Sequence, residues 1–256
     1  MKNINLKDII EKQIDNFIYA GDVAIQLRNK GLTKEIKSDN TPVSNGDLEV
    51  NKIITKKILE LTPDLPIVSE ETSHNKSSKN LTNFWLVDPI DGTYDYINNG
   101  DEFTINAGLI INKSVAAGII YAPAKNRMFY TFGNDISYEL NNDVEKVLNN
   151  KKIDKDNIKA VSYSNNLNSD ILELHKKLNV KEYVKMKSSI KFCVVATGEY
   201  QVYIADARAS EWDIAAGHAI LKNSGGIITD FHGNEILYGK TGFKNPSIIC
   251  KSLDDI

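Results

Sequence analysis

The stretch FWLVDPIDGT at residues 84–93 carries the strongest structural signal in the chain. Its four apolar residues run directly into Asp88, which is typical of a short, buried strand with an acid at its carboxyl end. Pro89 cannot donate a hydrogen bond to a neighbouring strand, so we expect the strand to stop there.

The turn after this strand combines acids with small residues. Asp91, Gly92 and Thr93 predict a tight turn that opens a short helix over residues 94–97, with Asp91 or Thr93 as its N-cap. Carboxylates would then lie beside free N–H groups at a helix start. Hard cations such as Mg²⁺ prefer carboxylate oxygens, and phosphate prefers helix-start N–H groups. On this stretch alone, a solvated turn without a ligand explains the acids equally well.

The composition is that of an ordinary globular protein. A chain of 256 residues is long enough for one large domain or two smaller ones. Its net charge of −3 argues against a nucleic-acid coat and against binding to anionic membranes. Cys193 and Cys250 lack metal-ligand spacing and indicate buried thiols in a reducing cytoplasm. There is no long apolar run and no apolar leader, so we expect no stable membrane insertion.

The first third of the chain predicts two helices. A long amphipathic helix is expected over residues 5–29, ending at Gly31. Residues 38–46 have the composition of a loop, and Asp47 follows as the N-cap of a second helix that runs through Leu61. This capping role is what position alone favours for Asp47, and it leaves the side chain free to face a cleft as well.

A mostly antiparallel sheet is expected next. An apolar strand at residues 67–68 runs into Glu70 and Glu71, and residues 72–83 predict a polar surface loop. Further strands are expected at residues 103–111, 115–121, 128–132 and 137–140, the first two joined as a hairpin. Residues 141–157 are rich in Asn, Asp and Lys and are the expected connection between two domains.

Strands and helices alternate in the remaining part, which predicts an α/β domain. The expected strands are residues 160–163, 201–204, 227–229 and 246–250, and the expected helices are residues 169–178, 189–197 and 212–224. The chain is thus divided into an α+β domain, residues 1–155, and an α/β domain, residues 156–256.

A third acidic site lies at the start of the last helix. Glu211 and Asp213 flank Trp212, and by position Asp213 is a helix cap. The small residues that follow at 215–217 would let this helix pack closely on a sheet.

These segments together resemble the inositol monophosphatase superfamily of Mg²⁺-dependent, lithium-sensitive phosphatases. The similarity rests on the E-E pair at Glu70, on W-x-V-D-P-I-D-G-T from Trp85 and on W-D-x-A-A-G from Trp212, in this order. It extends over nearly the whole chain. It implies the sugar-phosphatase fold, a layered sandwich with an α+β half, an α/β half and a metal site between them.

Three further segments are similar to the CysQ-type 3′(2′),5′-bisphosphate nucleotidases within that superfamily. Residues 100–106 (GDEFTIN) resemble the branch's G-x-E-F-T-V-N, residues 121–123 its Y-A-P, and residues 187–193 (KSSIKFC) its S-S-x-K-F-C. The resemblance implies hydrolysis of the 3′-phosphate of adenosine 3′,5′-bisphosphate to AMP and phosphate. In this family the reaction clears a by-product of sulfur metabolism.

The resemblance also implies a set of metal ligands, Glu70, Asp88, Ile90, Asp91 and Asp213. Glu70, Asp88 and the backbone carbonyl of Ile90 would hold one Mg²⁺. Asp88, Asp91 and Asp213 would hold a second, so that Asp88 bridges the pair. Glu71 would lie just outside these ligands, where a third and weaker ion is an alternative. Ligand sets made only of oxygens suit Mg²⁺ and disfavour Zn²⁺.

Catalytic roles follow from the same resemblance. Thr93, hydrogen-bonded to Asp47, would orient and help to deprotonate the attacking water, with Glu70 as the third catalytic candidate. The scissile phosphate would lie against Asp91 and the backbone N–H groups of Gly92 and Thr93.

Substrate contacts are implied at Ser188, Lys191 and Asp213. Ser188 and Lys191 align with residues that contact the non-scissile phosphate or the sugar. The nucleotidases carry an Arg phosphate contact where this chain has Ala205. Our hypothesis is that Arg208 replaces that contact.

Two other functions stay open. Inositol phosphatases place an acid in the region of Asp206 to meet a sugar hydroxyl, so an inositol or related sugar monophosphatase is the first alternative. A catalytically idle scaffold that binds phosphate or RNA is the second. The expected partner is a small nucleotide rather than a nucleic acid, and the sequence leaves both monomer and homodimer open.

Overall fold

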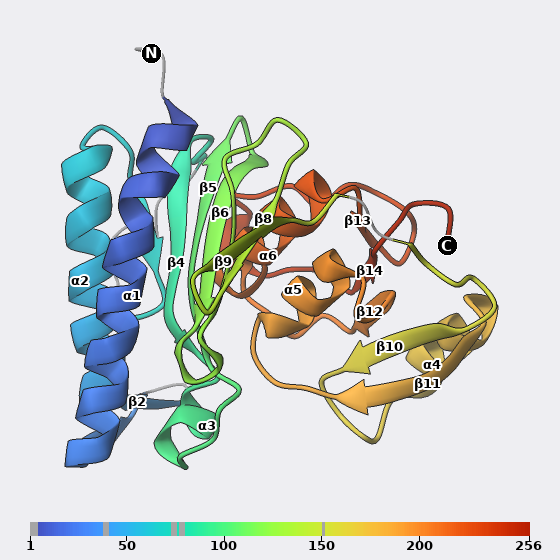
Figure 1. The fold of residues 1–256 in the computed structure, drawn as a ribbon, viewed down its shortest axis with the longest axis horizontal. Helices are drawn as coiled ribbons and strands as arrows, with labels where there is room; N and C mark the ends of the chain where they lie inside the picture. Colours follow the sequence, from blue (N-terminus) through green and yellow to red (C-terminus); the bar gives the residue numbers. More distant parts are fainter. Residues whose placement is uncertain (1–4, 38–40, 73–75, 77–79, 150–151) are drawn as a thin grey trace.

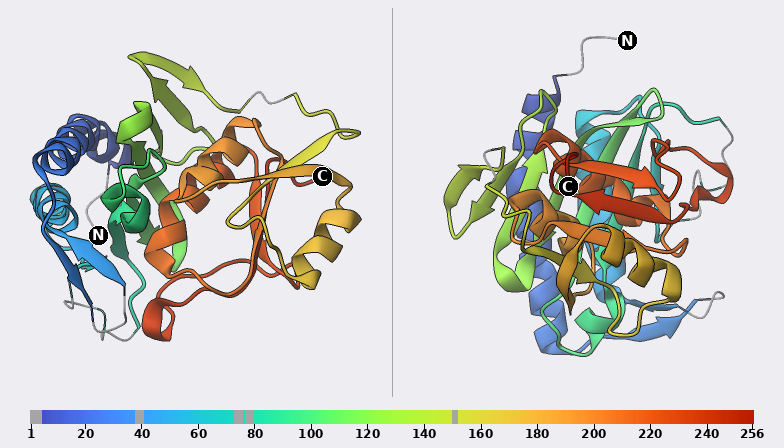
Figure 2. Two further views of the ribbon diagram at one scale, coloured as in Figure 1. Left: turned by 90° about the horizontal axis from the view of Figure 1, so that it is seen from below. Right: turned by 90° about the vertical axis from the view of Figure 1, so that its right-hand side faces the viewer.

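The computed structural model describes residues 5–37, 41–72, 76, 80–149 and 152–256. Helices and sheets alternate in layers (Figures 1 and 2). Helices α1 (Leu6–Lys30) and α2 (Asn45–Leu61) cover one face of a seven-stranded sheet. Helices α5 (Ile190–Thr197) and α6 (Glu211–Asn223) lie between that sheet and a five-stranded one, and α4 (Ser169–Lys177) packs on the outer side of the second sheet. The predicted layered sandwich is confirmed.

The seven strands of the large sheet follow one another in chain order. They are β3 (Ile67–Ser69), β4 (Phe84–Asp91), β5 (Thr104–Ile111), β6 (Ser114–Ala122), β7 (Arg127–Thr131), β8 (Tyr138–Asn141) and β9 (Val144–Val147). Only β3 and β4 pair in parallel. A short 3₁₀-helix, η1 (Pro123–Lys125), joins β6 to β7.

Strand β9 corrects the expectation of a connection over residues 141–157. Asn142 and Asp143 both take left-handed backbone angles, which closes a two-residue hairpin turn between β8 and β9. Asn and Asp tolerate this conformation better than most residues. The first part of the expected connection, through Val147, therefore belongs to the sheet, and the rest of it lies in the sequence between β9 and β10. Residues 150–151 of the same stretch lie outside the described residues.

The expected end of β4 at Pro89 is also wrong, because the strand continues to Asp91. Asp88 pairs with Asn106 and Asp91 pairs with Thr104, so two residues of β4 oppose one residue of β5. Pro89 lies inside this bulge, where no ladder hydrogen bond is required of it. The bulge changes the direction of the backbone between Asp88 and Asp91.

Helix α3 (Thr93–Ile97) follows directly, but neither Asp91 nor Thr93 caps it. The N-cap is Gly92, whose φ of 91° lies in the left-handed region. A Cβ at this position would lie 2.9 Å from the backbone oxygen of Glu102. Both observations require glycine here.

Helix α2 is capped by Ser44 rather than by Asp47. Asp47 is the third residue of the helix, and its carboxylate accepts hydrogen bonds from the backbone N (2.8 Å) and Oγ (2.6 Å) of Ser44. The predicted loop over residues 38–46 contains the second strand of a hairpin made by β1 (Lys34–Ile36) and β2 (Pro42–Ser44). Residues 38–40 lie outside the described residues, as do residues 73–75 and 77–79 of the predicted loop 72–83.

The second sheet has the order β11-β10-β12-β14-β13. Its strands are β10 (Ile158–Ser162), β11 (Val180–Lys185), β12 (Val202–Ala205), β13 (Ile227–Asp230) and β14 (Ile248–Lys251), and a 3₁₀ turn, η2 (Thr241–Phe243), precedes the last of them. Strands β11, β10 and β12 are parallel, whereas β14 runs antiparallel to both β12 and β13. Strand β11 was missed because its side chains are mostly exposed and lack an apolar run.

Helix α6 packs closely on the large sheet, as its small residues predicted. A Cβ on Gly108 of β5 would lie 2.8 Å from the Cβ of Ala215, and one on Gly118 of β6 would lie 2.8 Å from the backbone oxygen of Ala216. Ile214 and Ile220 of the helix belong to a core cluster shared by both sheets. Each such buried side chain stabilises the fold by ~1.5–3 kcal/mol, so the position of α6 is strongly fixed.

In the described part of the chain, no helix is both long enough and apolar enough to cross a lipid bilayer.

Candidate active site

Four acids from different elements come within electrostatic reach of one another. Glu70 follows β3, Asp88 and Asp91 lie on β4, and Asp213 lies in the first turn of α6. Burial raises the pKa of Asp88 well above its usual value, and the nearby charges of Glu70, Asp91 and Asp213 raise it further. The layered fold therefore brings together the acids that the sequence predicted.

The environment of Asp88 fits a bound cation. Its side chain is 1% exposed, and its Oδ1 atom has no hydrogen-bond partner in the described structure. Among the nearby charges, that of Glu70 contributes most to the raised pKa of this carboxyl group. An ionised carboxylate only accepts hydrogen bonds. A cation would therefore coordinate the unpartnered Oδ1 and neutralise the negative charge of the neighbouring carboxylates.

The acids are near one another without converging on a point. Among the residues that the structure describes, no three Asp, Glu, His or Cys side chains are grouped as a ready-made ion site. The donor set nevertheless consists of carboxylates, with the backbone carbonyl of the buried Ile90 next to them in sequence. Such oxygen ligands are those that Mg²⁺ prefers.

Asp91 and Asp213 are both held by hydrogen bonds that orient them. Asp213 is the third residue of α6 and not its cap, and its Oδ2 accepts from the backbone N of Ser210 at 2.7 Å. Burial raises the pKa of Asp213, and the charge of Asp91 adds to this. Burial also raises the pKa of Asp91, against the opposing charge of Lys191 and a hydrogen bond from Ser189.

Thr93 and Asp47 meet as the sequence predicted. Thr93 Oγ1 lies 3.0 Å from Asp47 Oδ1 and 3.0 Å from the carbonyl oxygen of Ile90. Its single proton can be donated to only one of these acceptors at a time. Burial raises the pKa of Asp47, although the hydrogen bonds from Ser44 and Thr93 oppose the shift.

Lys37 is a site residue that the sequence did not predict. Its Nζ lies 3.0 Å from Glu70 Oε1 and 2.7 Å from Glu71 Oε1. Burial lowers the pKa of Lys37, but the charges of Glu70 and Glu71 outweigh burial and leave it raised. Burial raises the pKa of Glu71 to about 7. A lone lysine beside a loop gives no sequence signal, because its partners lie more than 30 residues away.

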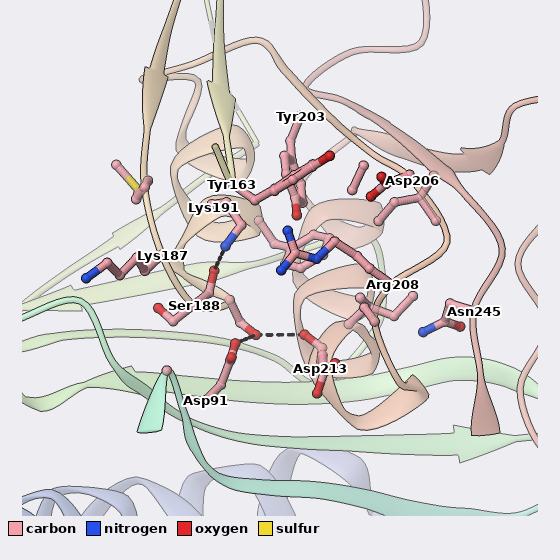
Figure 3. Close-up of a pocket in the computed structure, with 18 of the residues that line it drawn as sticks. Asp91, Tyr163, Lys187, Ser188, Lys191, Tyr203, Asp206, Arg208, Asp213 and Asn245 are labelled. Atoms are coloured by element: carbon pink, nitrogen blue, oxygen red, sulfur yellow. Dashed lines mark hydrogen bonds between the residues drawn. The ribbon is translucent and has the colours of Figure 1, made fainter. Parts of the chain in front are cut away.

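A cavity of about 310 Å³ opens beside Asp91 and Asp213 (Figure 3). Its lining includes the predicted residues Gly92, Ser188, Lys191 and Arg208, and also Tyr163, Lys187, Ser189, Tyr203, Asp206 and Asn245. The fold thus places the predicted substrate residues around one space. Asp47, Glu70, Asp88 and Thr93 are not part of this lining.

Two cationic side chains point into the cavity from the side opposite the acids (Figure 3). Lys191 is buried, and its burial lowers the pKa to about 8, with a contribution from the nearby charge of Arg208. The guanidinium of Arg208 lies over the ring of Tyr163, 4.2 Å from its centroid. Arginine stacks well on aromatic rings, so Tyr163 fixes the direction of the charged group.

Asp206 also lines the cavity, as the inositol-phosphatase alternative requires. Its Oδ2 accepts a hydrogen bond from Asn168 Nδ2 at 3.4 Å, and its buried Oδ1 has no partner among the described residues. Tyr163 could have been suspected from sequence only as a polar aromatic residue after a strand, which is too common a pattern to single it out.

Comparison with known proteins identifies relatives over the whole length of the chain. The model of the inositol monophosphatase family matches residues 5–254. The 3′(2′),5′-bisphosphate nucleotidase CysQ of Buchnera aphidicola is 34% identical, covering 99% of this chain and 100% of that protein. The enzyme of the same name from Escherichia coli K12 is 31% identical over 89% of this chain and 93% of its own length.

Solved structures agree with this similarity. The crystal structure of CysQ from Bacteroides thetaiotaomicron, a bacterial member of the inositol monophosphatase family, superposes with a TM-score of 0.78 at 26% identity, covering 96% of this chain and 97% of that one. The IMPase of Thermotoga maritima superposes with a TM-score of 0.76 at 23% identity, over 96% and 92% of the two chains. At that lower identity the likeness shows the fold alone.

Proposed function

Because the chain belongs to the inositol monophosphatase family, we propose that it is a phosphoric monoester hydrolase of the 3′(2′),5′-bisphosphate nucleotidase type. Its reaction is hydrolysis of the 3′-phosphate of adenosine 3′,5′-bisphosphate to AMP and phosphate. The relatives that carry this name are 30–34% identical to the chain.

The observation that carries the proposal is the pair of cations across the cavity from the acids. Lys191 and Arg208 face Asp91 and Asp213 over a space of about 310 Å³ (Figure 3). A monophosphate needs only the site at the acids. A substrate with two phosphates places its second one at a distance, where a desolvated lysine and a rigid guanidinium bind it well.

The proposal includes two Mg²⁺ ions. Glu70, Asp88 and the carbonyl of Ile90 would hold one, and Asp88, Asp91 and Asp213 the other. When bound, the ions would lower the pKa of a water molecule and neutralise charge on the phosphate. A third ion beside Glu71 is an alternative, since the partly buried Glu70 and Glu71 both pair with the same ammonium group, that of Lys37. The sensitivity to lithium that is typical of the family is part of the same proposal.

The residues around the scissile phosphate have distinct tasks. The hydroxyl of Thr93 donates its proton to Asp47, so the lone pairs of Thr93 can accept a proton from the attacking water. The first N–H groups of α3, at Gly92 and Thr93, have no partner within the helix and can donate to phosphate oxygens. Ser188 and Lys191 contact the far side of the substrate, together with Arg208.

The wider assignments are proposals as well. The halves 1–155 and 156–256 would meet at the substrate, since Glu70, Asp88 and Asp91 come from the first and Lys191, Arg208 and Asp213 from the second. A cytoplasmic location agrees with the buried free thiols of Cys193 and Cys250. The role would be the removal of a by-product of sulfur metabolism, with a small molecule as partner and the oligomeric state open.

The test is release of phosphate in the presence of Mg²⁺, with adenosine 3′,5′-bisphosphate and inositol 1-phosphate compared as kcat/KM. We expect a preference of about a hundredfold for the bisphosphate, since losing a charged contact costs ~1.5–3 kcal/mol. A preference for inositol 1-phosphate would favour the alternative monophosphatase. The unpartnered oxygen of Asp206 supports that alternative, because it could accept a hydrogen bond from a sugar hydroxyl.

A further inference from the structure

The side chain of Ser189 connects two of the acids. Ser189 directly precedes α5 and is fully buried. Its hydroxyl lies 2.5 Å from Oδ2 of Asp91 on β4 and 2.7 Å from the backbone oxygen of Asp213 in the first turn of α6. The hydrogen bonds drawn between Asp91 and Asp213 in Figure 3 both run through this hydroxyl. One small group therefore links elements that are far apart in the sequence.

Asn106 on β5 extends this link to a third acid. Its Nδ2 donates to Ser189 Oγ at 3.2 Å, and its side chain is fully buried. Asn106 pairs directly with Asp88 in the β4–β5 ladder. Directly opposed residues of antiparallel strands carry their side chains on the same face. In the described structure, the Oδ1 atoms of both Asn106 and Asp88 are buried without a hydrogen-bond partner.

These contacts join two segments that contain residues without a role in the proposed reaction. Asn106 ends the segment GDEFTIN, and Ser189 is the second serine of KSSIKFC. Neither side chain has a predicted role as a ligand or catalyst. Their hydrogen bond joins the strand that pairs with Asp88 to the residue that contacts Asp91 and Asp213.

We infer that Ser189 and Asn106 form a positioning pair that sets the separation of Asp88, Asp91 and Asp213 and so determines the affinity of the divalent-cation site. The inference rests on the proposed function, since it concerns the same site. Buried carboxylates of like charge repel one another. The hydroxyl has one proton, which it can donate to Asp91 or to the backbone oxygen of Asp213. Without the hydroxyl, the end of β4 and the first turn of α6 lose this shared donor, and the ligand set opens.

The test measures cation binding directly, with Mn²⁺ as the probe and free Mn²⁺ followed by electron paramagnetic resonance. Ser189→Ala, Asn106→Ala and the double variant are compared with the full-length wild-type chain. The matched control is Ser137→Ala. Ser137 is also a fully buried serine that donates to a backbone oxygen of α6, Ile220, at 2.7 Å, but it lies far along the helix from the acids.

We expect Ser189→Ala to raise the Kd for Mn²⁺ about tenfold or more, because a hydrogen bond to a charged group is lost. Asn106→Ala should raise the Kd severalfold. In the double variant the rise in Kd should be smaller than the product of the two single rises, because the two residues act as a unit. Ser137→Ala should stay within about twofold of the wild type while losing thermal stability like Ser189→Ala. At saturating Mn²⁺, kcat should recover further than at limiting Mn²⁺, as expected when only ligand positions have changed.

Wild-type affinity in both Ser189→Ala and Asn106→Ala would overturn the inference and leave the proposed function standing. If Ser189→Ala does not fold, Asn106→Ala alone decides between the two results. A wild-type chain that binds no Mn²⁺ would overturn the cation site of the proposed function and the positioning pair with it.

Discussion

The hydroxyl of Thr93 lies 3.0 Å from Oδ1 of Asp47, so the first residue of α3 is joined to the first turn of α2. Asp47 is held in turn by two hydrogen bonds from Ser44. A carboxylate fixed in this way cannot rotate to follow Thr93. It therefore offers the hydroxyl of Thr93 a carboxylate acceptor at one defined place.

This relationship predicts that Thr93→Ala lowers kcat by a hundredfold or more, since general acid–base groups typically contribute ~10²–10⁴-fold. KM for the bisphosphate should change little, because the backbone N–H groups remain. Thr93→Ser should keep most of the activity. Steady-state kinetics at saturating Mg²⁺ check this. The control is Thr55→Ala in α2, where the hydroxyl donates to the backbone oxygen of Asn51. An equal loss in Thr93→Ala and Thr55→Ala would contradict the role.

Asp88→Asn should abolish phosphatase activity and yet stabilise the protein in the presence of EDTA. The pKa of Asp88 in the folded protein is raised, mainly by burial. When a carboxyl pKa is raised by folding, the folded state is favoured at low pH. This stability is lost as the pH rises from the pKa in the unfolded protein to the pKa in the folded protein. At pH 8 the neutral amide removes that cost, and a gain of ~1 kcal/mol would raise Tm by about 2–4 °C.

The control for this stability effect is Asp230→Asn. Hydrogen bonds from Asn234 lower the pKa of Asp230, so its charge is favourable in the folded state. Replacing it should not raise Tm. Thermal melts at pH 5 and pH 8 separate the two cases, since the gain from Asp88→Asn should shrink at the lower pH. A loss of stability in Asp88→Asn at pH 8 would show that its charge is already compensated without a cation.

Arg208→Ala should raise KM for adenosine 3′,5′-bisphosphate about tenfold or more, because a charge-assisted contact with the second phosphate is lost. Adenosine 3′-monophosphate lacks that phosphate, so its kinetics should be nearly unchanged. Arg208→Lys should recover only part of the loss, because lysine cannot stack on Tyr163 as the guanidinium does. An equal rise of KM with both substrates would place Arg208 outside the recognition of the second phosphate.

Lys191 should give the reaction a pH limit on the alkaline side. Burial lowers its pKa to about 8, so the free enzyme loses this positive charge as the pH rises through that value. The value of kcat/KM, which reports groups of the free enzyme, should then fall above about pH 8 for the bisphosphate. Lys191→Arg should shift that limit upwards, since arginine stays protonated. Parallel profiles for the two proteins would assign the alkaline limit to another group.

Each acid of the site lies next to a local pattern in the sequence, but its expected role as a metal ligand came from the resemblance to the inositol monophosphatase superfamily. Asp88 follows an apolar run, Glu70 follows a short strand, and Asp213 lies in a helix start. The layered order of helices and sheets also followed from local periodicity. The capping of α2 by Ser44 was within reach as well, since a serine three residues before an acid is the signature of a capping box.

Other features depend on partners that the sequence does not reveal. Pro89 was expected to end β4, but a bulge opposite β5 removes the need for its missing N–H. Lys37 acquires its role only where its hairpin folds onto Glu70 and Glu71. The direction of Arg208 is set by the ring of Tyr163, which belongs to another strand end. Tertiary contacts decide each of these cases, and local propensity cannot anticipate them.

The position of β14 has a consequence for the order in which the protein folds during its synthesis. Although it is the last of the described strands, β14 lies inside the second sheet, between β12 and β13. During synthesis from the N-terminus, β12 and β13 therefore have no common neighbour until residues 248–251 emerge from the ribosome. The sheet supports the segment that carries Arg208 and Asp213, so a nascent chain that lacks β14 would contain these two residues without the complete sheet that positions them. Hydrolytic competence should accordingly appear in a single late step of biosynthesis rather than grow with chain length.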